Sequence, residues 1–436
     1  MTPPGPKGRP LIGVLTEFRK DPPGFLAKNA IEFGDVVYIP VGRQRIYYVG
    51  HPDAVRDILV TNQSKFKKSR MLERARILLG DGLLTSEGEH HKRQRRLMQP
   101  AFHRDRLAGY GATMAQRADA AQARWQGSQP FDVAQEMMRL TLDIVGRTLF
   151  SSDVDSEADE IGAALNQVFG LFEVILMPFS EWLEKLPLPS VRRFHRARAR
   201  LDRTIYRLIA ERRANPHDTG DLLSMLLLAQ DEESHAGMTD MQVRDEALTL
   251  FLAGHETTAN ALTWTWYLLS QNPEAEAAFH AELGRVLAGR LPTVADLPQL
   301  RYTESVLAES LRLYPPAWGI GRRALEDYSL GGYVIPKSSV VLTSPYVVHR
   351  DSRWFPEPLA FRPERWLTED TARPKFAYFP FGGGTRVCIG ERFAWMEGIL
   401  VLATIGQRWR LSLEPGHRVE THARITLRTK YGMRMT

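Results

Sequence analysis

The sequence predicts one large, mainly α-helical unit with small β-sheets. Three observations predict this fold class. Residues 90–290 are interpreted mainly as helices, among them one long helix at 241–271. Short strand-like stretches precede and follow that region, at 38–49, 328–343 and 410–436. No linker, repeat or low-complexity tract divides the chain, so we expect a single domain over 1–436, although the length alone suggests two or three.

Composition is that of an ordinary globular protein, with 43% hydrophobic and 25% charged residues. No apolar run approaches the roughly 18 residues that span a bilayer. The first ten residues lack the apolar core of a signal peptide, and a single cysteine fits a reducing compartment. We therefore expect a cytoplasmic protein without a stable membrane anchor.

The net charge of +6 raises the question of a nucleic-acid partner. The arginines lie mostly in amphipathic helical stretches such as 191–200, where a solvated face is the ordinary explanation. No nucleic-acid-binding motif occurs. We expect no nucleic acid, and an acidic electron-transfer protein as the more economical partner for a basic surface.

The first elements along the chain are an early hairpin and a basic helix. β-branched and aromatic residues at 38–40 and 45–49 predict the hairpin. The segment 88–96 is predicted to be helical, and it places His91 and Arg95 one turn apart. Any one of these cations alone is more often an exposed surface charge.

Residues 241–271 are predicted to form one long helix. A glycine inside a helix costs about 1 kcal/mol relative to alanine, so Gly254 needs a reason, such as close approach of a bulky flat ligand. Thr257 can donate a hydrogen bond to the Ala253 carbonyl and open the helix locally, with Glu256 beside it as a proton-exchanging group. A packed helix with an ordinary internal threonine bond is the alternative. The residues that share this face are Leu250, Ala253, Gly254, Thr257, Thr258 and Ala261.

A buried charge pair is predicted in the following helix, at 303–313. Glu309 and Arg312 face each other at positions i and i+3. The flanking residues are apolar, which indicates burial, and a buried pair needs further partners. Arg365, in the segment 361–366, offers one.

Cys388 is the only cysteine, so it is a free thiol, a ligand or a nucleophile. Glycines at 382–384 remove side chains that would keep a flat cofactor from the backbone, and Phe381 supplies an aromatic wall. Arg386 and the N-terminus of a helix predicted after Gly390 favour the thiolate. These features favour a thiolate ligand of haem iron over a buried structural cysteine.

Several motifs together resemble one known family. The segments 253–258, 309–312 and 363–366 resemble the oxygen-activation motif, the E-x-x-R helix and the P-E-R-F loop of the cytochrome P-450 superfamily, with Trp366 in place of Phe. The resemblance implies the cytochrome P-450 fold, a triangular helix-rich prism with haem between the oxygen-activating helix and the cysteine loop. The pattern that resembles the family's haem-binding signature is Phe381, Gly384, Arg386, Cys388 and Gly390.

The resemblance also implies roles for individual residues. Cys388 would hold the haem iron, Glu256 would feed in protons, and the Thr257 hydroxyl would organise bound dioxygen and its protons. The structural triad behind the haem would be Glu309, Arg312 and Arg365. The residues expected to contact the haem or its propionates are His91, Arg95, Ala253, Gly254, Arg322 (or its neighbour Arg323), Phe381, Arg386 and Gly390.

The regions that form the family's substrate pocket are apolar in this chain, which predicts an apolar substrate. The stretch 172–182 is expected to be a lid, with contact to a membrane surface as the alternative. Arg43 and Tyr47 resemble the carboxylate-anchoring pair of bacterial fatty-acid hydroxylases, so long-chain fatty acids stand beside terpenoids and steroids. The expected lining residues are Leu78, Leu79, Val174, Leu250, Trp318 and Ile425, with Leu83 and Leu84 in the same region as the first two.

The implied activity is that of a haem-thiolate monooxygenase. The cofactor would be haem b, the co-substrate dioxygen, and the electron source NAD(P)H through separate proteins, because no flavin or iron–sulfur segment occurs in the sequence. The expected partners are a ferredoxin with its reductase, or a flavodoxin-type donor. The alternatives are a peroxygenase or isomerase on the same scaffold and a non-catalytic haem sensor. The basic residues expected near the docking surface are Lys92, Arg93, Arg96 and Arg392.

Overall fold

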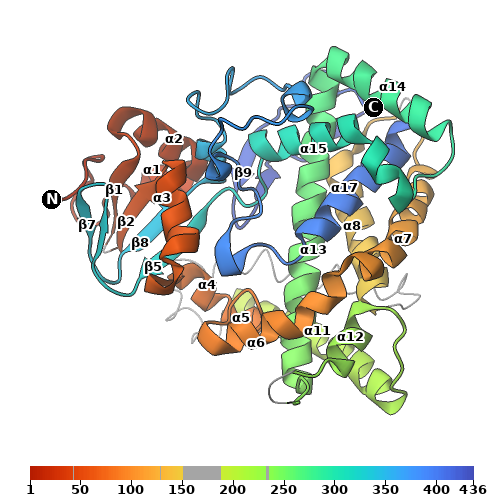
Figure 1. Ribbon diagram of the computed structural model, residues 1–436, viewed down its shortest axis with the longest axis horizontal. Helices are drawn as coiled ribbons and strands as arrows, with labels where there is room; N and C mark the ends of the chain where they lie inside the picture. The colour runs from red at the N-terminus through yellow and green to blue at the C-terminus, as the bar shows by residue number, and fades with distance from the viewer. Residues whose placement is uncertain (43, 128, 151–187, 232–234) are drawn as a thin grey trace.

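The structure is a computed structural model that describes residues 1–42, 44–127, 129–150, 188–231 and 235–436. Helices make up most of it, and the larger sheet lies toward the N-terminal side of the molecule (Figure 1). The prediction of a mainly α-helical chain with small sheets is therefore confirmed.

The elements are named in chain order. The helices are α1 (Leu15–Lys20), α2 (Pro22–Phe33), α3 (Pro52–Arg56), α4 (Arg70–Arg74), α5 (Arg76–Leu79), α6 (Gly88–Met98), α7 (Arg104–Gln122), α8 (Val133–Phe150), α11 (Pro189–Ala214), α12 (Leu222–Leu228), α13 (Asp240–Gln271), α14 (Pro273–Leu287), α15 (Arg301–Leu313), α16 (Pro345–Val348) and α17 (Glu391–Gly406). The strands are β1 (Val36–Val41), β2 (Gln44–Val49), β3 (Phe66–Lys68), β4 (Phe131–Asp132), β5 (Ile320–Ala324), β6 (Tyr328–Leu330), β7 (Tyr333–Ile335), β8 (Val340–Thr343), β9 (Thr421–Ala423), β10 (Leu427–Thr429) and β11 (Arg434–Met435).

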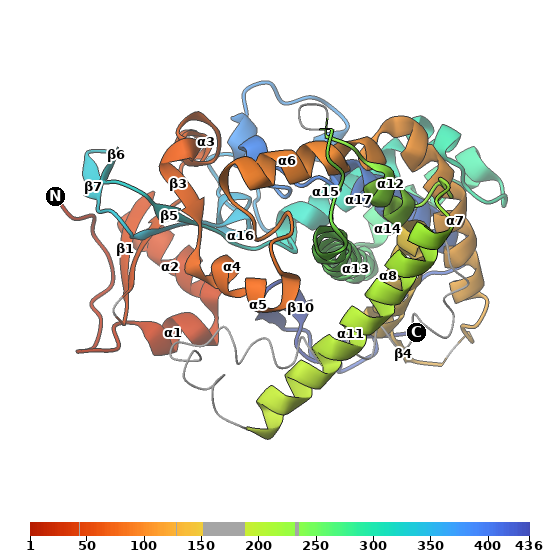
Figure 2. The same ribbon diagram turned by 90° about the horizontal axis from the view of Figure 1, so that it is seen from below.

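Helix α13 runs through the middle of the molecule and is seen nearly end-on in Figure 2. It begins with a capping box, in which the Thr239 hydroxyl accepts from the Gln242 amide at 3.3 Å and the Gln242 side chain accepts from the Thr239 amide at 3.0 Å. It ends where Pro273 starts the next helix, since proline cannot continue the hydrogen-bond ladder. The predicted helix at 241–271 is confirmed.

The larger sheet has five strands in the order β1-β2-β8-β5-β3. Strands β1 and β2 form the predicted early hairpin, with Tyr38 opposite Tyr47. Strand β8 joins β2 in parallel and β5 in antiparallel pairing. There are also three two-stranded sheets in the described part of the chain, β6–β7, β9–β10 and β4–β11. Together with β8 they contain the short strands predicted at 328–343 and 410–436.

The largest apolar cluster surrounds the C-terminal half of α13 and includes residues of α7, α8, α14, α15 and α17. Trp264 is fully buried there and stacks on Tyr314, with ring centroids 4.1 Å apart and planes inclined by 5°. Its indole nitrogen donates to the Leu427 carbonyl at 3.0 Å. The core thus ties the central helix to the C-terminal β9–β10 hairpin. None of the helices in the described ranges has the length and apolar character needed to cross a membrane.

Candidate active site

Cys388 lies in the loop that leads into α17. Its amide donates to the Phe381 carbonyl at 3.0 Å, a 3₁₀ turn at Gly384–Arg386 precedes it, and the predicted helix begins at Glu391. The cysteine is free and accessible to solvent, although its sulfur lies deep within the protein. Burial raises the pKa of Cys388 to about 11, an effect that the Gly390 backbone and the Arg95 charge oppose.

The cation that acts on this thiol differs from the predicted one. Arg95 of α6 donates to the Val387 carbonyl at 2.7 Å and is the cation that lowers the pKa of Cys388. Arg386 instead donates to the Ser86 carbonyl at 2.8 Å and forms an ion pair with Glu87. Proximity in sequence misled the prediction, because the Arg386 guanidinium binds Ser86 and Glu87 instead.

The glycines of the cysteine loop are required by the loop's own packing. Gly384 has a φ of +69°, and an added Cβ would lie 2.0 Å from the Leu59 carbonyl oxygen. A Cβ on Gly383 would lie 2.6 Å from the Phe376 ring. Close packing against residues 59 and 376 is therefore a second reason for these glycines, besides the predicted room for a flat cofactor.

Helix α13 has an open face in its middle. Ala253 is exposed and Gly254 and Thr257 are half-buried, on a helix whose neighbouring residues are nearly all buried. The Thr257 hydroxyl donates to the Ala253 carbonyl at 2.7 Å, as predicted. An added Cβ on Gly254 would lie 3.1 Å from a Val145 methyl of α8, so helix packing is one reason for this glycine.

The Glu256 carboxylate points toward the C-terminal hairpin. It is 3% exposed and accepts from Arg428 Nε at 2.8 Å, from Arg428 Nη2 at 2.7 Å and from the Thr426 hydroxyl. Asn260 bridges the two segments, donating to the Glu256 carbonyl at 2.9 Å and to Thr426 Oγ1 at 3.2 Å. Sequence reasoning missed Thr426 and Arg428 because no local spacing relates residues that lie about 170 positions apart in the chain.

A group of basic residues lies beside the cysteine loop. His91 is 4% exposed, and burial followed by the Arg386 charge lowers its pKa to about 3. Burial and then Arg386 likewise lower the pKa of Arg322 to about 10 and that of Lys68 to about 7. Glu87 and Glu246 oppose these effects only in part, so the group carries more positive charge than its carboxylates balance. Lys68 was not predicted, since a lysine in a short strand gives no sequence signal.

Arg322 and Arg323, which are adjacent on β5, are the two alternatives predicted to contact a haem propionate. Arg323 forms an ion pair with Glu73. Arg322 donates only to the carbonyl of its neighbour Gly321, at 3.1 Å, among the contacts of the described residues. The geometry therefore favours Arg322 as the residue available to a ligand.

The predicted triad of Glu309, Arg312 and Arg365 is brought together. Glu309 and Arg312 are fully buried and form two hydrogen bonds, at 2.8 and 2.9 Å, and Arg365 Nε donates to Glu309 at 2.9 Å. Trp366 also donates to Glu309, at 2.8 Å, which gives a reason for tryptophan in this loop. Arg312 further donates to the carbonyl oxygens of His349, Pro358 and Ala360, so the buried charges are satisfied.

The predicted pocket lining falls mainly into one apolar group, here called the substrate-side cluster. Trp318 is an exception, since it packs against the β1–β2 side of the molecule, although its indole donates to the Arg424 carbonyl at 2.9 Å. The substrate-side cluster includes Leu78, Leu79, Leu83, Phe194, Leu201, Leu248, Leu250 and Phe251, with Ile389 and Ile425 packed against it.

The predicted carboxylate anchor is not supported. Tyr47 is 2% exposed, belongs to the core beneath the five-stranded sheet and packs on Tyr38 with ring centroids 5.4 Å apart. A ring enclosed by its own sheet is not available to a substrate carboxylate. Arg43, Val174 and the predicted lid at 172–182 lie outside the described residues.

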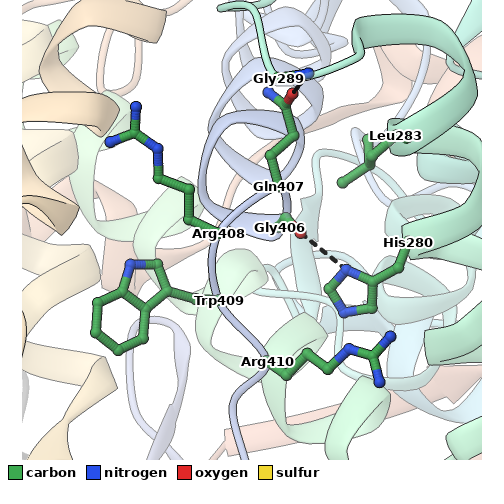
Figure 3. A pocket seen from close by; sticks show the side chains of 9 residues that line it. His280, Leu283, Gly289, Gly406, Gln407, Arg408, Trp409 and Arg410 are labelled. Atoms are coloured by element: carbon green, nitrogen blue, oxygen red, sulfur yellow. Dashed lines mark hydrogen bonds between the residues drawn. The ribbon is translucent and has the colours of Figure 1, made fainter. Parts of the chain in front are cut away.

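A separate pocket of about 500 Å³ lies between α14 and the end of α17 (Figure 3). His280 donates there to the Gly406 carbonyl at 2.8 Å, and Arg410 lies near the imidazole. None of the predicted catalytic or haem-contacting residues lines it. The pocket is therefore distinct from the candidate active site.

The site residues fit haem. The group needs one soft axial ligand and cationic donors for two propionates. Cys388 is a free, accessible thiol in the protein interior, and the cations around His91, Arg95, Arg322 and Arg386 exceed the nearby carboxylates. Both requirements of an iron porphyrin dicarboxylate are thus met by residues of the chain.

Comparison with known proteins identifies the family. The family model described as "Cytochrome P450" matches residues 3–432. Cyclooctatin synthase of Streptomyces melanosporofaciens is 43% identical over 97% of this chain and 92% of its own length. Cyclooctat-9-en-7-ol 5-monooxygenase of the same organism is 40% identical (94% and 90% covered), and pentalenene oxygenase of Streptomyces avermitilis is 37% identical (97% and 94% covered).

The free cysteine in a loop beside basic residues, and the acid–alcohol pair on the central helix, fit a haem-thiolate oxygenase. The chain belongs to the cytochrome P450 family. It is a monooxygenase that uses haem iron and dioxygen, takes electrons from redox partners and oxidises an apolar small molecule.

Proposed function

We propose that this cytochrome P450 hydroxylates a cyclic terpenoid, either a hydrocarbon or an alcohol. The observation that carries the proposal is the similarity, over 94% or more of the chain, to relatives named for pentalenene and cyclooctat-9-en-7-ol. The apolar substrate-side cluster supports it. Burial of Tyr47 weakens the case for long-chain fatty acids as substrates. The test below also includes steroids as possible substrates.

Cys388 is proposed as the residue that would hold the haem iron. Because the thiolate is the ligand form, Cys388 must lose its proton on binding, and Arg95 stabilises the resulting charge. When bound, haem supplies the activation of dioxygen and the insertion of one oxygen atom into a C–H bond. His91, Arg95, Arg322 and Arg386 are proposed to hold its propionates, with Phe381 and Ala253 beside the ring.

Glu256 and Thr257 are proposed to move protons to the reacting oxygen. The Thr257 hydroxyl lies on the open face of α13. Glu256 is held by Arg428, whose side chain is 33% exposed, so the buried acid is connected to the surface through this arginine. When the ion pair with the partly exposed Arg428 opens, the Glu256 carboxylate can exchange a proton with solvent.

Electrons are proposed to come from NAD(P)H through a ferredoxin and its reductase, with the chain forming one haem domain over 1–436. The docking surface needs revision, because Arg96 pairs with the buried Asp231 at 2.6 Å and Arg93 donates to backbone carbonyls at residues 236 and 237. The better candidates are the exposed Arg392 at the start of α17 and Lys92, whose side chain is 64% exposed although it pairs with the exposed Glu89 at 2.6 Å. A cytoplasmic location is part of the same proposal, tested by fractionation of cells that express the protein.

The function is tested by reconstitution with haem, ferredoxin, ferredoxin reductase and NAD(P)H. The substrates are cyclic terpenoid hydrocarbons and alcohols, steroids, and long-chain fatty acids with their methyl esters. We expect a monohydroxylated terpenoid, formed in step with NAD(P)H consumption and carrying oxygen from labelled dioxygen. Preference for a steroid or fatty acid would overturn the substrate class.

The same assay separates the alternative functions. Product formed from hydrogen peroxide but not from dioxygen and NAD(P)H would indicate a peroxygenase. Conversion without net oxidation would indicate an isomerase. Haem binding with no turnover of any substrate would indicate a sensor. The acid–alcohol pair at Glu256 and Thr257 favours the monooxygenase over each of these, since it serves proton delivery.

A further inference from the structure

Two basic residues are paired across strands β3 and β5. Lys68 of β3 is directly opposite Arg322 of β5 in the antiparallel register. Residues in this relation share one face of the sheet, with Cβ atoms about 5 Å apart, and like charges there are destabilising. Lys68 is 5% exposed, so solvent ions screen the repulsion poorly. The pair is therefore stable only with a negative group nearby.

The carboxylates of this region are engaged by other donors. Glu87 pairs with Arg386 and accepts from the Lys68 amide at 2.7 Å. Glu246 accepts from a backbone amide at 2.8 Å and from a glutamine side chain at 3.0 Å. In the described part of the chain, the side chains of Lys68 and Arg322 donate only to backbone carbonyls and form no ion pair.

The Lys68 ammonium keeps one donor for a ligand. An ammonium group carries three N–H donors. Two of them are used, in bonds to the Leu83 and Ser86 carbonyls at 2.8 Å each. The described residues supply no acceptor for the third. Because an unsatisfied charged donor is costly inside a protein, this geometry favours an acceptor that comes from a bound anion.

The position of Lys68 matches that of the proposed haem ligands. Lys68 is one of the charges that lower the pKa of His91, after burial and Arg386. Arg95, one turn from His91, acts on Cys388. Burial and then Arg386 lower the pKa of Lys68 to about 7, and a carboxylate beside the ammonium favours its charged form. A haem carboxylate is thus the kind of anion that this group of basic residues can take.

We propose that Lys68 holds a haem propionate together with Arg322 and Arg386. The third N–H of the ammonium donates to the propionate, and the two bonds to backbone carbonyls hold the ammonium in place for it. Lys68 is a cofactor-positioning residue and does not touch the reacting atoms. The inference rests on the proposed haem site and adds to it a residue that no sequence motif indicates.

Haem retention tests the role of Lys68. The apoprotein is loaded with haem b or with haem dimethyl ester, which has no propionate charge, and haem transfer to excess apomyoglobin gives the rate of loss. With haem b, we expect Lys68→Met to lose haem about tenfold faster than wild type, because a charge-assisted hydrogen bond is removed. With the dimethyl ester, the two proteins should lose haem at nearly equal rates.

Two further variants control for the substitution itself. Lys67→Met is the matched control, since Lys67 is the neighbouring residue of β3 and pairs with Glu73 at 3.3 Å. It should retain haem b as the wild type does. Lys68→Arg keeps a positive charge at the site and should restore part of the retention that Lys68→Met loses.

The comparison of the two haems separates binding from loop support. Equal acceleration by Lys68→Met with haem b and with the ester would show that Lys68 acts only through the Leu83 and Ser86 carbonyls, and would overturn the proposal. Unchanged retention of haem b in Lys68→Met would overturn it as well. Neither measurement uses a substrate, so a failure of terpenoid hydroxylation leaves the result decisive, whereas a wild type that binds no haem would overturn the proposed function itself.

Discussion

Glu397 provides the sharpest test of the electrostatics of the core. It lies on α17, is fully buried, and neither carboxylate oxygen has a hydrogen-bond partner within the described ranges of the chain. Thr258 lies close enough to oppose the effect of burial slightly, but its hydroxyl donates to the Gly254 carbonyl at 3.1 Å. Burial raises the pKa of Glu397 from 4.5 to about 8.

The direction of the pH effect follows from this pKa. Between pH 4.5 and about pH 8, the native carboxyl keeps its proton while the same group in the unfolded chain is ionised. The unfolded state therefore binds fewer protons, and the free energy of unfolding falls as pH rises through this window. At about 1.4 kcal/mol for each pH unit, the whole window corresponds to about 5 kcal/mol.

Replacing Glu397 by glutamine removes this dependence. We expect Glu397→Gln to gain stability relative to wild type as pH rises from 4.5 to 8, by up to about 5 kcal/mol. Urea unfolding of the haem-loaded proteins, followed by circular dichroism across this range, measures the difference. Glu274→Gln, at an exposed carboxylate on α14, is the control. A stability difference between Glu397→Gln and wild type that does not vary with pH would refute the reasoning.

Three further predictions concern the haem site and its protons. Cys388→His should shift the Soret band of the reduced carbon monoxide complex from its thiolate position to that of an imidazole complex; a wild-type band already at the imidazole position would contradict thiolate ligation. Thr257→Ala should keep haem binding and substrate affinity but release more hydrogen peroxide per NAD(P)H, and an unchanged product yield would exclude its role. Arg428→Met should lower product yield per NAD(P)H and alter its pH profile, whereas Arg428→Lys should restore part of both, since lysine keeps the charge beside Glu256. Equal effects of Met and Lys would assign Arg428 a packing role instead.

The parts of the structure that depend on neighbours in sequence could be predicted. The long helix α13 follows from its apolar spacing and its cap, and the Thr257–Ala253 bond follows from helix geometry alone. Glu309 and Arg312 meet because i and i+3 share a helix face. In each case the partner lies within one turn, so the sequence itself specifies the contact.

The partners that lie far apart in the chain could not be predicted. The spacing pointed to Arg386 as the cation at Cys388, but the fold brings Arg95 there, 293 positions away along the sequence from its target. Lys68 joins the cation group from a three-residue strand that has no motif. Tyr47 matched the expected carboxylate-anchoring pattern. Its burial depends on the assembled five-stranded sheet, which the local sequence does not specify. Long-range packing, not local propensity, sets these contacts.

The C-terminal hairpin shows how far such long-range contacts reach into the site. Ile425 packs on the substrate-side cluster, and the next residue, Thr426, donates to the Glu256 carboxylate. Arg428 holds the same carboxylate, while the Leu427 carbonyl between them accepts from Trp264 in the core. Four consecutive residues thus connect the substrate-side cluster, Glu256 and the central helix. The hairpin backbone therefore links the packing of Ile425 to the position of Glu256, because the residues that hold them are adjacent in the chain.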